Sequence, residues 1–222
     1  MRKNDLPRVF APGCALMLYK PELAERMRRM LEENLGHMDP WMRCCRKDPG
    51  FAKKTEVINI CPGCDKRFRK DYKNSTTVSL WAVLAGTDFF PFPDYGGEVM
   101  TIIDACPTRD RPRVHDAVRT LLKKMNIVLK EPQATRTKGK CCGDITWGEL
   151  PVDEVKARMR ERASEMPADD VVVYCVSCAK AMFVGGRRPR YMIDLLFNEE
   201  TVPKTFEPAE WHRLIDEYID AH

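Results

Sequence analysis

Cysteine is the residue type whose number and spacing in this chain point most directly to chemistry. Ten cysteines occur in 222 residues, and they run as a single residue, an adjacent pair and a C-x-x-C motif, twice over. The first group is Cys14, Cys44, Cys45, Cys61 and Cys64, and the second is Cys106, Cys141, Cys142, Cys175 and Cys178. Because the same order is used twice with none left over, the sequence predicts an internal duplication.

Three kinds of chemistry use clustered thiols. The first residues contain no apolar run of the kind that directs secretion, so we expect a reducing, cytoplasmic location in which disulfides are uncommon. Zinc is a second possibility because C-x-x-C is half of a common zinc site, but a tetrahedral ion has no use for a fifth thiolate. An iron–sulfur cluster is the third, and irregular spacing over several loops is usual for its ligands. The pattern favours the cluster, with zinc and disulfides as alternatives.

The segments around each cysteine group predict the elements that position it. Apolar or β-branched runs precede the single cysteines and the C-x-x-C motifs, at Arg8–Pro12, Glu56–Ile60, Val99–Ala105 and Asp170–Tyr174. Amphipathic helices are expected from Pro21, Arg111 and Pro151. This alternation predicts an α/β fold with two pseudo-symmetric Rossmann-like lobes. Each lobe is a small, mainly parallel sheet flanked by helices, with the cysteines at the carboxyl ends of its strands.

The two copies meet in a segment near residues 90–97 that is rich in Pro, Gly and aromatic residues. We therefore expect an N-terminal lobe over residues 1–95 and a C-terminal lobe over 96–222, packed on each other because the connection is short. Fifteen residues separate Cys45 from Cys61, whereas 32 separate Cys142 from Cys175. The first lobe is therefore expected to lack one helix.

Composition excludes several classes of protein. Hydrophobic residues make up 44% of the chain and the net charge is only +4, which argues against disorder and against a nucleic-acid partner. The most apolar runs are far shorter than the roughly 18–20 residues of a membrane span, so none is expected.

Basic residues lie close to the cysteines in sequence. They are Arg43, Arg46 and Lys47, then Lys66, Arg67, Arg69 and Lys70, then Arg136, Lys138 and Lys140, and finally Arg187, Arg188 and Arg190. Such cations would stabilise an anionic thiolate site or bind an anionic thiol, although a solvated face is the simpler interpretation.

The second cysteine group resembles a known family motif. Cys106-Pro107, Cys141-Cys142-Gly143-Asp144 and Cys175-Val-Ser-Cys178 are similar to the cysteine-rich CCG domain of the B subunit of heterodisulfide reductase and its relatives. The first group is similar but reads Cys44-Cys45-Arg46, with Arg in place of Gly, and then Cys61-Pro-Gly-Cys64. The likeness extends from about Arg8 to Phe197, nearly the whole chain.

The resemblance implies one noncubane [4Fe-4S] cluster for each cysteine group. Cys106, Cys141, Cys142, Cys175 and Cys178 would hold one, and Cys14, Cys44, Cys45, Cys61 and Cys64 the other. It further implies a reductase that splits a small disulfide between two clusters, supplied with electrons by a ferredoxin-like or flavoprotein partner. A non-catalytic electron-transfer or assembly subunit and a zinc-binding structural protein are the alternatives.

A few further residues complete the sequence-based expectations. Gly139 and Gly143 bracket the second pair and suit a close approach of backbone to the site. His115 is expected to be an ordinary surface or core residue on its helix. The C-terminal segment from Glu207 predicts an amphipathic helix that closes the fold.

Overall fold

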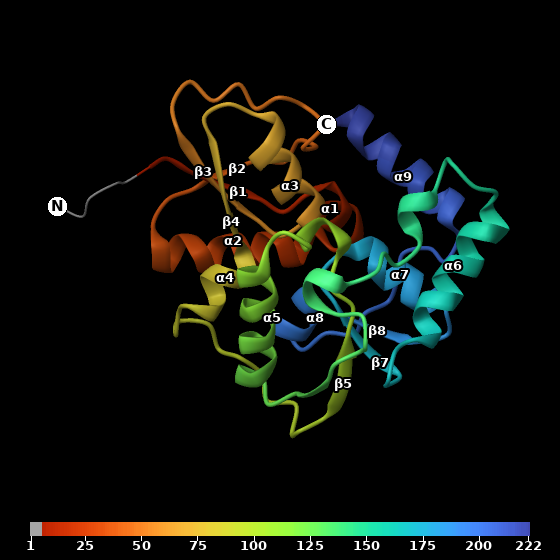
Figure 1. Cartoon of the computed structure of the whole chain (residues 1–222). Helices are drawn as coiled ribbons and strands as arrows, with labels where there is room; N and C mark the ends of the chain where they lie inside the picture. Colours follow the sequence, from red (N-terminus) through yellow and green to blue (C-terminus); the bar gives the residue numbers. More distant parts are fainter. Residues whose placement is uncertain (1–5) are drawn as a thin grey trace.

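The computed structural model describes residues 6–222, which form two four-stranded, all-parallel sheets flanked by helices (Figure 1). The first sheet consists of β1 (Arg8–Ala11), β2 (Asp39–Pro40), β3 (Thr55–Asn59) and β4 (Ser75–Ser79), in the order β2-β1-β3-β4. The second consists of β5 (Val99–Ile102), β6 (Val128–Lys130), β7 (Asp170–Val173) and β8 (Arg188–Tyr191), in the order β6-β5-β7-β8. The two orders match strand for strand. The prediction of an α/β fold with two Rossmann-like lobes is therefore confirmed.

Helices form most of the connections between the parallel strands. The first lobe contains α1 (Cys14–Tyr19), α2 (Pro21–Leu35), α3 (Pro62–Asp71) and α4 (Leu80–Ala85). The second contains α5 (Pro112–Lys124), α6 (Val152–Ser164), α7 (Val176–Val184), α8 (Met192–Leu196) and α9 (Pro208–Ala221). It also has three short 3₁₀ turns, η1 (Cys106–Thr108), η2 (Arg136–Lys138) and η3 (Asp144–Thr146).

The helices expected from Pro21, Arg111 and Pro151 are α2, α5 and α6, each beginning within one residue of the predicted start. Proline stands at the first turn of α2 and α5, where its missing N–H is not needed. The region between β2 and β3 contains no helix, whereas α6 fills the matching region between β6 and β7. The first lobe therefore lacks one helix, as the shorter cysteine spacing predicted.

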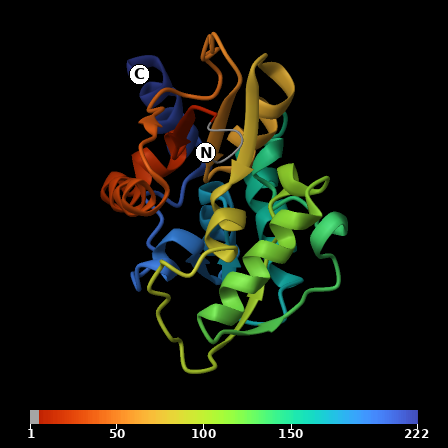
Figure 2. The same ribbon diagram turned by 90° about the vertical axis from the view of Figure 1, so that its left-hand side faces the viewer.

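The two lobes share one hydrophobic core. Phe10 and Ile58 of the first sheet belong to the same buried cluster as Ile102 and Val172 of the second. At the junction, α4 of the first lobe packs beside α5 of the second, which both views show (Figures 1 and 2). Each fully buried aliphatic side chain contributes about 1.5–3 kcal/mol relative to exposure, so separating the lobes would be costly.

Across residues 6–222, the structure contains no helix with the length and apolar character needed to cross a bilayer.

Candidate functional site

The two cysteine groups occupy equivalent places in the two lobes. Cys14 begins α1 directly after β1, and Cys106 begins η1 after β5. Cys61 and Cys175 are the N-cap residues of α3 and α7, each of which follows the neighbouring strand of its sheet. The adjacent pairs lie in the loops that follow β2 and β6. Because all strands of a sheet run in the same direction, each cysteine group collects at the carboxyl edge of its sheet.

The five thiols of the first lobe contact one another in a row, which we call the thiol chain. Cys14 and Cys45 both hydrogen-bond to Cys44, and Cys64 hydrogen-bonds to both Cys45 and Cys61. The chain therefore runs from Cys14 through the adjacent pair to the C-x-x-C motif.

The thiols of the second lobe repeat this chain contact for contact. Cys106 and Cys142 hydrogen-bond to Cys141, and Cys178 hydrogen-bonds to both Cys142 and Cys175. The Arg at position 46 and the shorter spacing of the first lobe thus leave the arrangement of its five thiols unchanged.

The pKa values show where negative charge collects in each chain. Hydrogen bonds from Cys14 and Cys45 lower the pKa of Cys44 far below its usual value, and those from Cys106 and Cys142 do the same for Cys141. The same bonds, together with burial, raise the pKa of Cys14 and of Cys106. Among the five thiols of each lobe, the first cysteine of the adjacent pair therefore has its ionised form favoured most strongly.

Backbone N–H groups also point at the sulfur atoms. Arg46 N lies 3.4 Å from Cys44 Sγ, and the N–H groups of Gly143 and Ile145 donate to Cys141. In the C-x-x-C motif of the first lobe, the hydrogen bond from Cys64, aided by two backbone N–H groups, lowers the pKa of Cys61 to about 7 despite its burial. These donors stabilise thiolates and would do the same for thiolate ligands of a metal centre.

Two glycines beside the cysteines allow close backbone packing, Gly13 against the C-x-x-C motif and Gly143 against helix α6. Gly13 has φ +85°, and a Cβ atom there would lie 3.0 Å from Cys61 Cβ and 3.3 Å from Cys64 Sγ. Gly143 has φ +105°, and a Cβ atom would lie 2.9 Å from Met159 N. The sequence pointed to Gly143, whereas it gave no reason to single out Gly13.

The contacts between the thiols are pairwise. Within residues 6–222, no three His, Cys, Asp or Glu side chains gather into a group that could hold a metal ion. The donor set still matches a thiolate-ligated cluster in kind, because each lobe supplies five cysteine sulfurs and backbone N–H donors to sulfur.

Asp104 organises the second site, and the sequence analysis missed it. Its carboxylate accepts two hydrogen bonds from Arg119, both at 2.9 Å, one from Tyr174 at 3.0 Å and one from Arg136 N at 2.6 Å. Burial opposes ionisation, but Arg119 and the Arg136 N–H outweigh it and hold the pKa of Asp104 at about 2. Tyr174 precedes Cys175, and Asp104 lies two residues before Cys106, so one carboxylate ties two cysteine-bearing segments together.

A second missed cluster lies behind the Cys141–Cys142 pair. Lys180, only 2% exposed, donates to Asp144 at 2.6 Å, and His212 lies 3.3 Å from the same oxygen. The His212 ring stacks on Trp147 at 4.9 Å. Two features of the sequence could have indicated this cluster. One is a lysine two residues after the C-x-x-C motif, and the other is an aspartate directly after Cys-Cys-Gly.

Helix α9 reaches both cysteine groups. Near its start, Trp211 Nε1 donates to Ser177 Oγ at 3.3 Å, inside the C-x-x-C motif of the second lobe. Near its end, Asp216 pairs with Arg46 at 3.3 Å, beside the adjacent pair of the first lobe. Burial, and after it the nearby Cys14 and Cys44 thiols, raise the pKa of Tyr218. The expectation that this helix closes the fold is confirmed, and it does so across both sites (Figure 1).

The lobes are also joined beneath the sites by a buried carboxylate. Asp194 of α8 accepts hydrogen bonds from Tyr19 at 2.7 Å, Lys20 at 2.9 Å and Thr201 at 2.7 Å. Burial raises the pKa of Asp194. This cluster ties α1 and the start of α2 to the second lobe.

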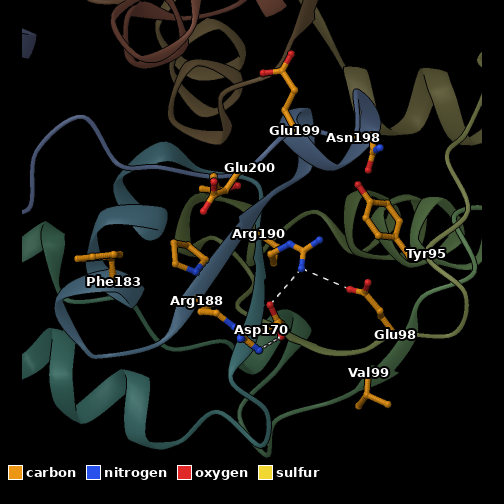
Figure 3. A pocket seen from close by; sticks show the side chains of 12 residues that line it. Tyr95, Glu98, Val99, Asp170, Phe183, Arg188, Arg190, Asn198, Glu199 and Glu200 are labelled. Atoms are coloured by element: carbon orange, nitrogen blue, oxygen red, sulfur yellow. Dashed lines mark hydrogen bonds and ion pairs between the residues drawn. The ribbon is translucent and has the colours of Figure 1, made fainter.

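The expectation that basic residues surround the cysteines holds for some residues and is wrong for others. Arg188 begins β8 and pairs in register with Asp170, the first residue of β7, so it lies at the amino edge of the sheet, opposite the cysteines. Arg190 bridges Asp170 and Glu98 beside a hollow of about 730 Å³ at that edge (Figure 3). These arginines follow Cys178 in sequence, but α7 carries the chain away from the site.

His115 is a fully buried core residue of α5, one of the two placements expected for it. Its Nε2 lies 3.0 Å from Thr108 Oγ1.

No protein-family model matches this chain, and no curated protein matches it. The likeness to the CCG family therefore rests on the cysteine motifs themselves.

Proposed function

We propose that this chain is an iron–sulfur redox protein of the heterodisulfide reductase B-subunit type, which binds one cluster in each lobe and reduces a disulfide. The observation that carries the proposal is the identical contact pattern of the two five-thiol chains. Two copies of a site that differ in length and flanking residues but keep the same four contacts among five thiols are expected where both sites bind the same kind of group.

The chemistry of the donors supports a thiolate-ligated cluster. Cys14, Cys44, Cys45, Cys61 and Cys64 would hold one cluster, and Cys106, Cys141, Cys142, Cys175 and Cys178 the other. Because metal ligation requires thiolates, cluster binding would release protons from those thiols of each lobe that are still protonated. Five thiolates exceed the needs of a single zinc ion, which takes four ligands.

Reduction of a disulfide to two thiols consumes two electrons and two protons and no other reactant. A disulfide RSSR takes up two electrons as its S–S bond breaks, and the two thiolates then take protons from solvent. When bound, clusters of this kind supply electrons one at a time, and a one-electron carrier protein must replace them.

The substrate would bind in a hollow beside Cys141. It has a volume of about 240 Å³, and Lys140, Arg158 and Arg162 line it with Cys141. Lys140 and Arg162 both pair with Glu165, whereas Arg158 has no carboxylate within 4 Å among residues 6–222. Arg158 would therefore bind a carboxylate or phosphate of a small anionic disulfide and orient its sulfur toward Cys141.

The first experiment measures iron, acid-labile sulfide and zinc in protein purified without oxygen, with EPR spectra of the oxidised form. About eight iron and eight sulfide per chain are expected for two four-iron clusters. Zinc without iron, after anaerobic handling, would refute the proposal.

Matched variants assign the iron to the lobes. Cys45→Ser and Cys142→Ser remove equivalent thiols, and each is expected to lower the iron content by about half. Turnover of small disulfides with reduced methyl viologen then separates a reductase from an electron-transfer subunit, since the latter would load iron and give no turnover.

A further inference from the structure

Positive charge is concentrated in two segments that carry cysteines. Residues 43–73 and residues 104–140 together contain 20 Lys and Arg against 8 Asp and Glu. The rest of the chain contains 17 basic and 25 acidic residues. The small net charge of the whole chain thus hides a strong asymmetry.

The fold brings these two segments together across the lobe junction. Helix α3 packs against η1. Arg69 of α3 pairs with Asp110 at 3.0 Å, and Arg109 donates to the Gly139 carbonyl at 2.7 Å. Helix α5 in turn contacts both η1 and η2, so segments that lie far apart in sequence adjoin one another from α3, over η1 and α5, to η2.

We call this strip the basic band, and define it by five exposed cations: Lys66, Lys70, Arg109, Arg113 and Lys138. Within residues 6–222, no carboxylate oxygen lies within 4 Å of the charged nitrogens of any of the five. Most other basic side chains of the molecule are paired, for example Arg28 with Glu25 and Lys20 with Asp194. Like charges kept side by side without partners raise the free energy of the isolated protein, and an anionic surface would lower it.

The band is placed where electrons must enter. Lys66 and Lys70 lie on α3, whose first turn carries Cys64, and Arg109 follows η1, which begins at Cys106. Lys138 lies three residues before Cys141. A protein seated on the band would therefore be adjacent to cysteines of both lobes.

We propose that the basic band is the docking surface for an acidic one-electron carrier protein. This inference rests on the proposed function and adds the place and the charge of the partner. The reduced carrier gives up one electron in each encounter and leaves oxidised, so two encounters supply the two electrons of one disulfide. A nucleic acid fits less well, because the remainder of the chain has an excess of acidic residues that repels a long polyanion.

The test uses the metal-loaded protein and an acidic two-cluster ferredoxin as the probe. Calorimetry gives Kd at about 50 and about 300 mM NaCl for the wild type, Lys66→Glu, Lys70→Glu and the matched control Arg160→Glu. Arg160 is an exposed, unpaired arginine on α6, outside the band, and its reversal makes the same change in net charge. Thermal unfolding checks that all variants fold.

Each reversal in the band is expected to raise Kd about threefold to tenfold at the lower salt concentration, and much less at the higher one. The Arg160→Glu control should stay within about twofold of the wild type, since its charge lies outside the contact. An unchanged Kd in both band variants, or an equal rise in the control, would overturn the inference. So would tighter binding of a short single-stranded oligonucleotide than of the ferredoxin.

A second readout separates this inference from the proposed function. Disulfide reduction driven by reduced methyl viologen needs no docking, so the band variants should keep the wild-type rate with viologen and lose rate only with the ferredoxin. A wild type that binds the ferredoxin at the band but reduces no disulfide with either donor would refute the reductase and leave the docking surface standing. Equal slowing with both donors would refute the docking role.

Discussion

Replacing Gly13 by alanine tests the geometry of the first site most directly. Gly13 lies between β1 and Cys14 with φ +85° and ψ 145°, a region that residues with a Cβ atom rarely adopt. The added methyl would lie 3.0 Å from Cys61 Cβ and 3.3 Å from Cys64 Sγ. Gly36 is a matched control, because it has nearly the same φ of +89° and, among residues 6–222, no atom within 4 Å of an added Cβ.

The two substitutions separate backbone strain from crowding of the site. Strain alone is expected to cost about 1–3 kcal/mol for both Gly13→Ala and Gly36→Ala. Gly13→Ala adds overpacking against Cys61 and Cys64, which costs about 1–3 kcal/mol more. For a chain of this length each kcal/mol lowers Tm by about 2–4 °C, so the two variants should differ by several degrees.

The assay is urea and thermal unfolding of the reduced, metal-free chain, followed by iron analysis of the protein purified without oxygen. Gly36→Ala should keep the wild-type iron content, whereas Gly13→Ala should lose about half of it, because it displaces two ligands of one lobe. Equal loss of stability in the two variants would show that Gly13 does not pack against the cysteines as described, and equal iron content would show that its close approach is not needed for the site.

Three further predictions concern other parts of the structure. The low pKa of Asp104 contributes about 2 kcal/mol of stability, which is present above pH 3.8 and is lost as the pH falls through about 2. The variant Asp104→Asn should therefore be less stable at neutral pH, and its free energy of unfolding in urea should change less between these two pH values. Identical pH profiles of the variant and the wild type would contradict this. Lys180→Met leaves the buried carboxylate of Asp144 without its ammonium partner, and should lower the free energy of unfolding in urea by about 3 kcal/mol. Adding Asp144→Asn to this variant should recover part of the lost stability. An unchanged stability of the single variant would show that the ion pair is dispensable. A chain ending at Glu207 lacks α9 and should react several times faster with iodoacetamide at cysteines of both groups, as mass spectrometry of the labelled peptides can measure; faster labelling in one lobe alone would mean that α9 does not cover both.

Local features of this fold were predictable from the sequence, whereas contacts between distant segments were not. The strands before Cys14, Cys61, Cys106 and Cys175 were predictable because short apolar runs between helical patterns are local signals. The missing helix of the first lobe followed from a count of residues between cysteines. Asp104 was not predictable, because its partners Arg119, Arg136 and Tyr174 lie up to 70 residues away along the chain. The predicted placement of Arg188 was wrong, because α7 carries the chain from Cys178 to the opposite edge of the sheet before β8 begins.

The sequence by itself therefore determined the duplication, the α/β class and the ten cysteines of the candidate site. These depend on residue type and on spacing along the chain, which local periodicity and counting can recover. Only the tertiary structure decided that the shorter first lobe keeps all four contacts among its five thiols, that α9 lies across both sites and that α3 and η1 form one basic strip. Each of these depends on contacts between segments far apart in sequence, and parallel strands joined by helices create such contacts by returning every cysteine to the same edge of its sheet.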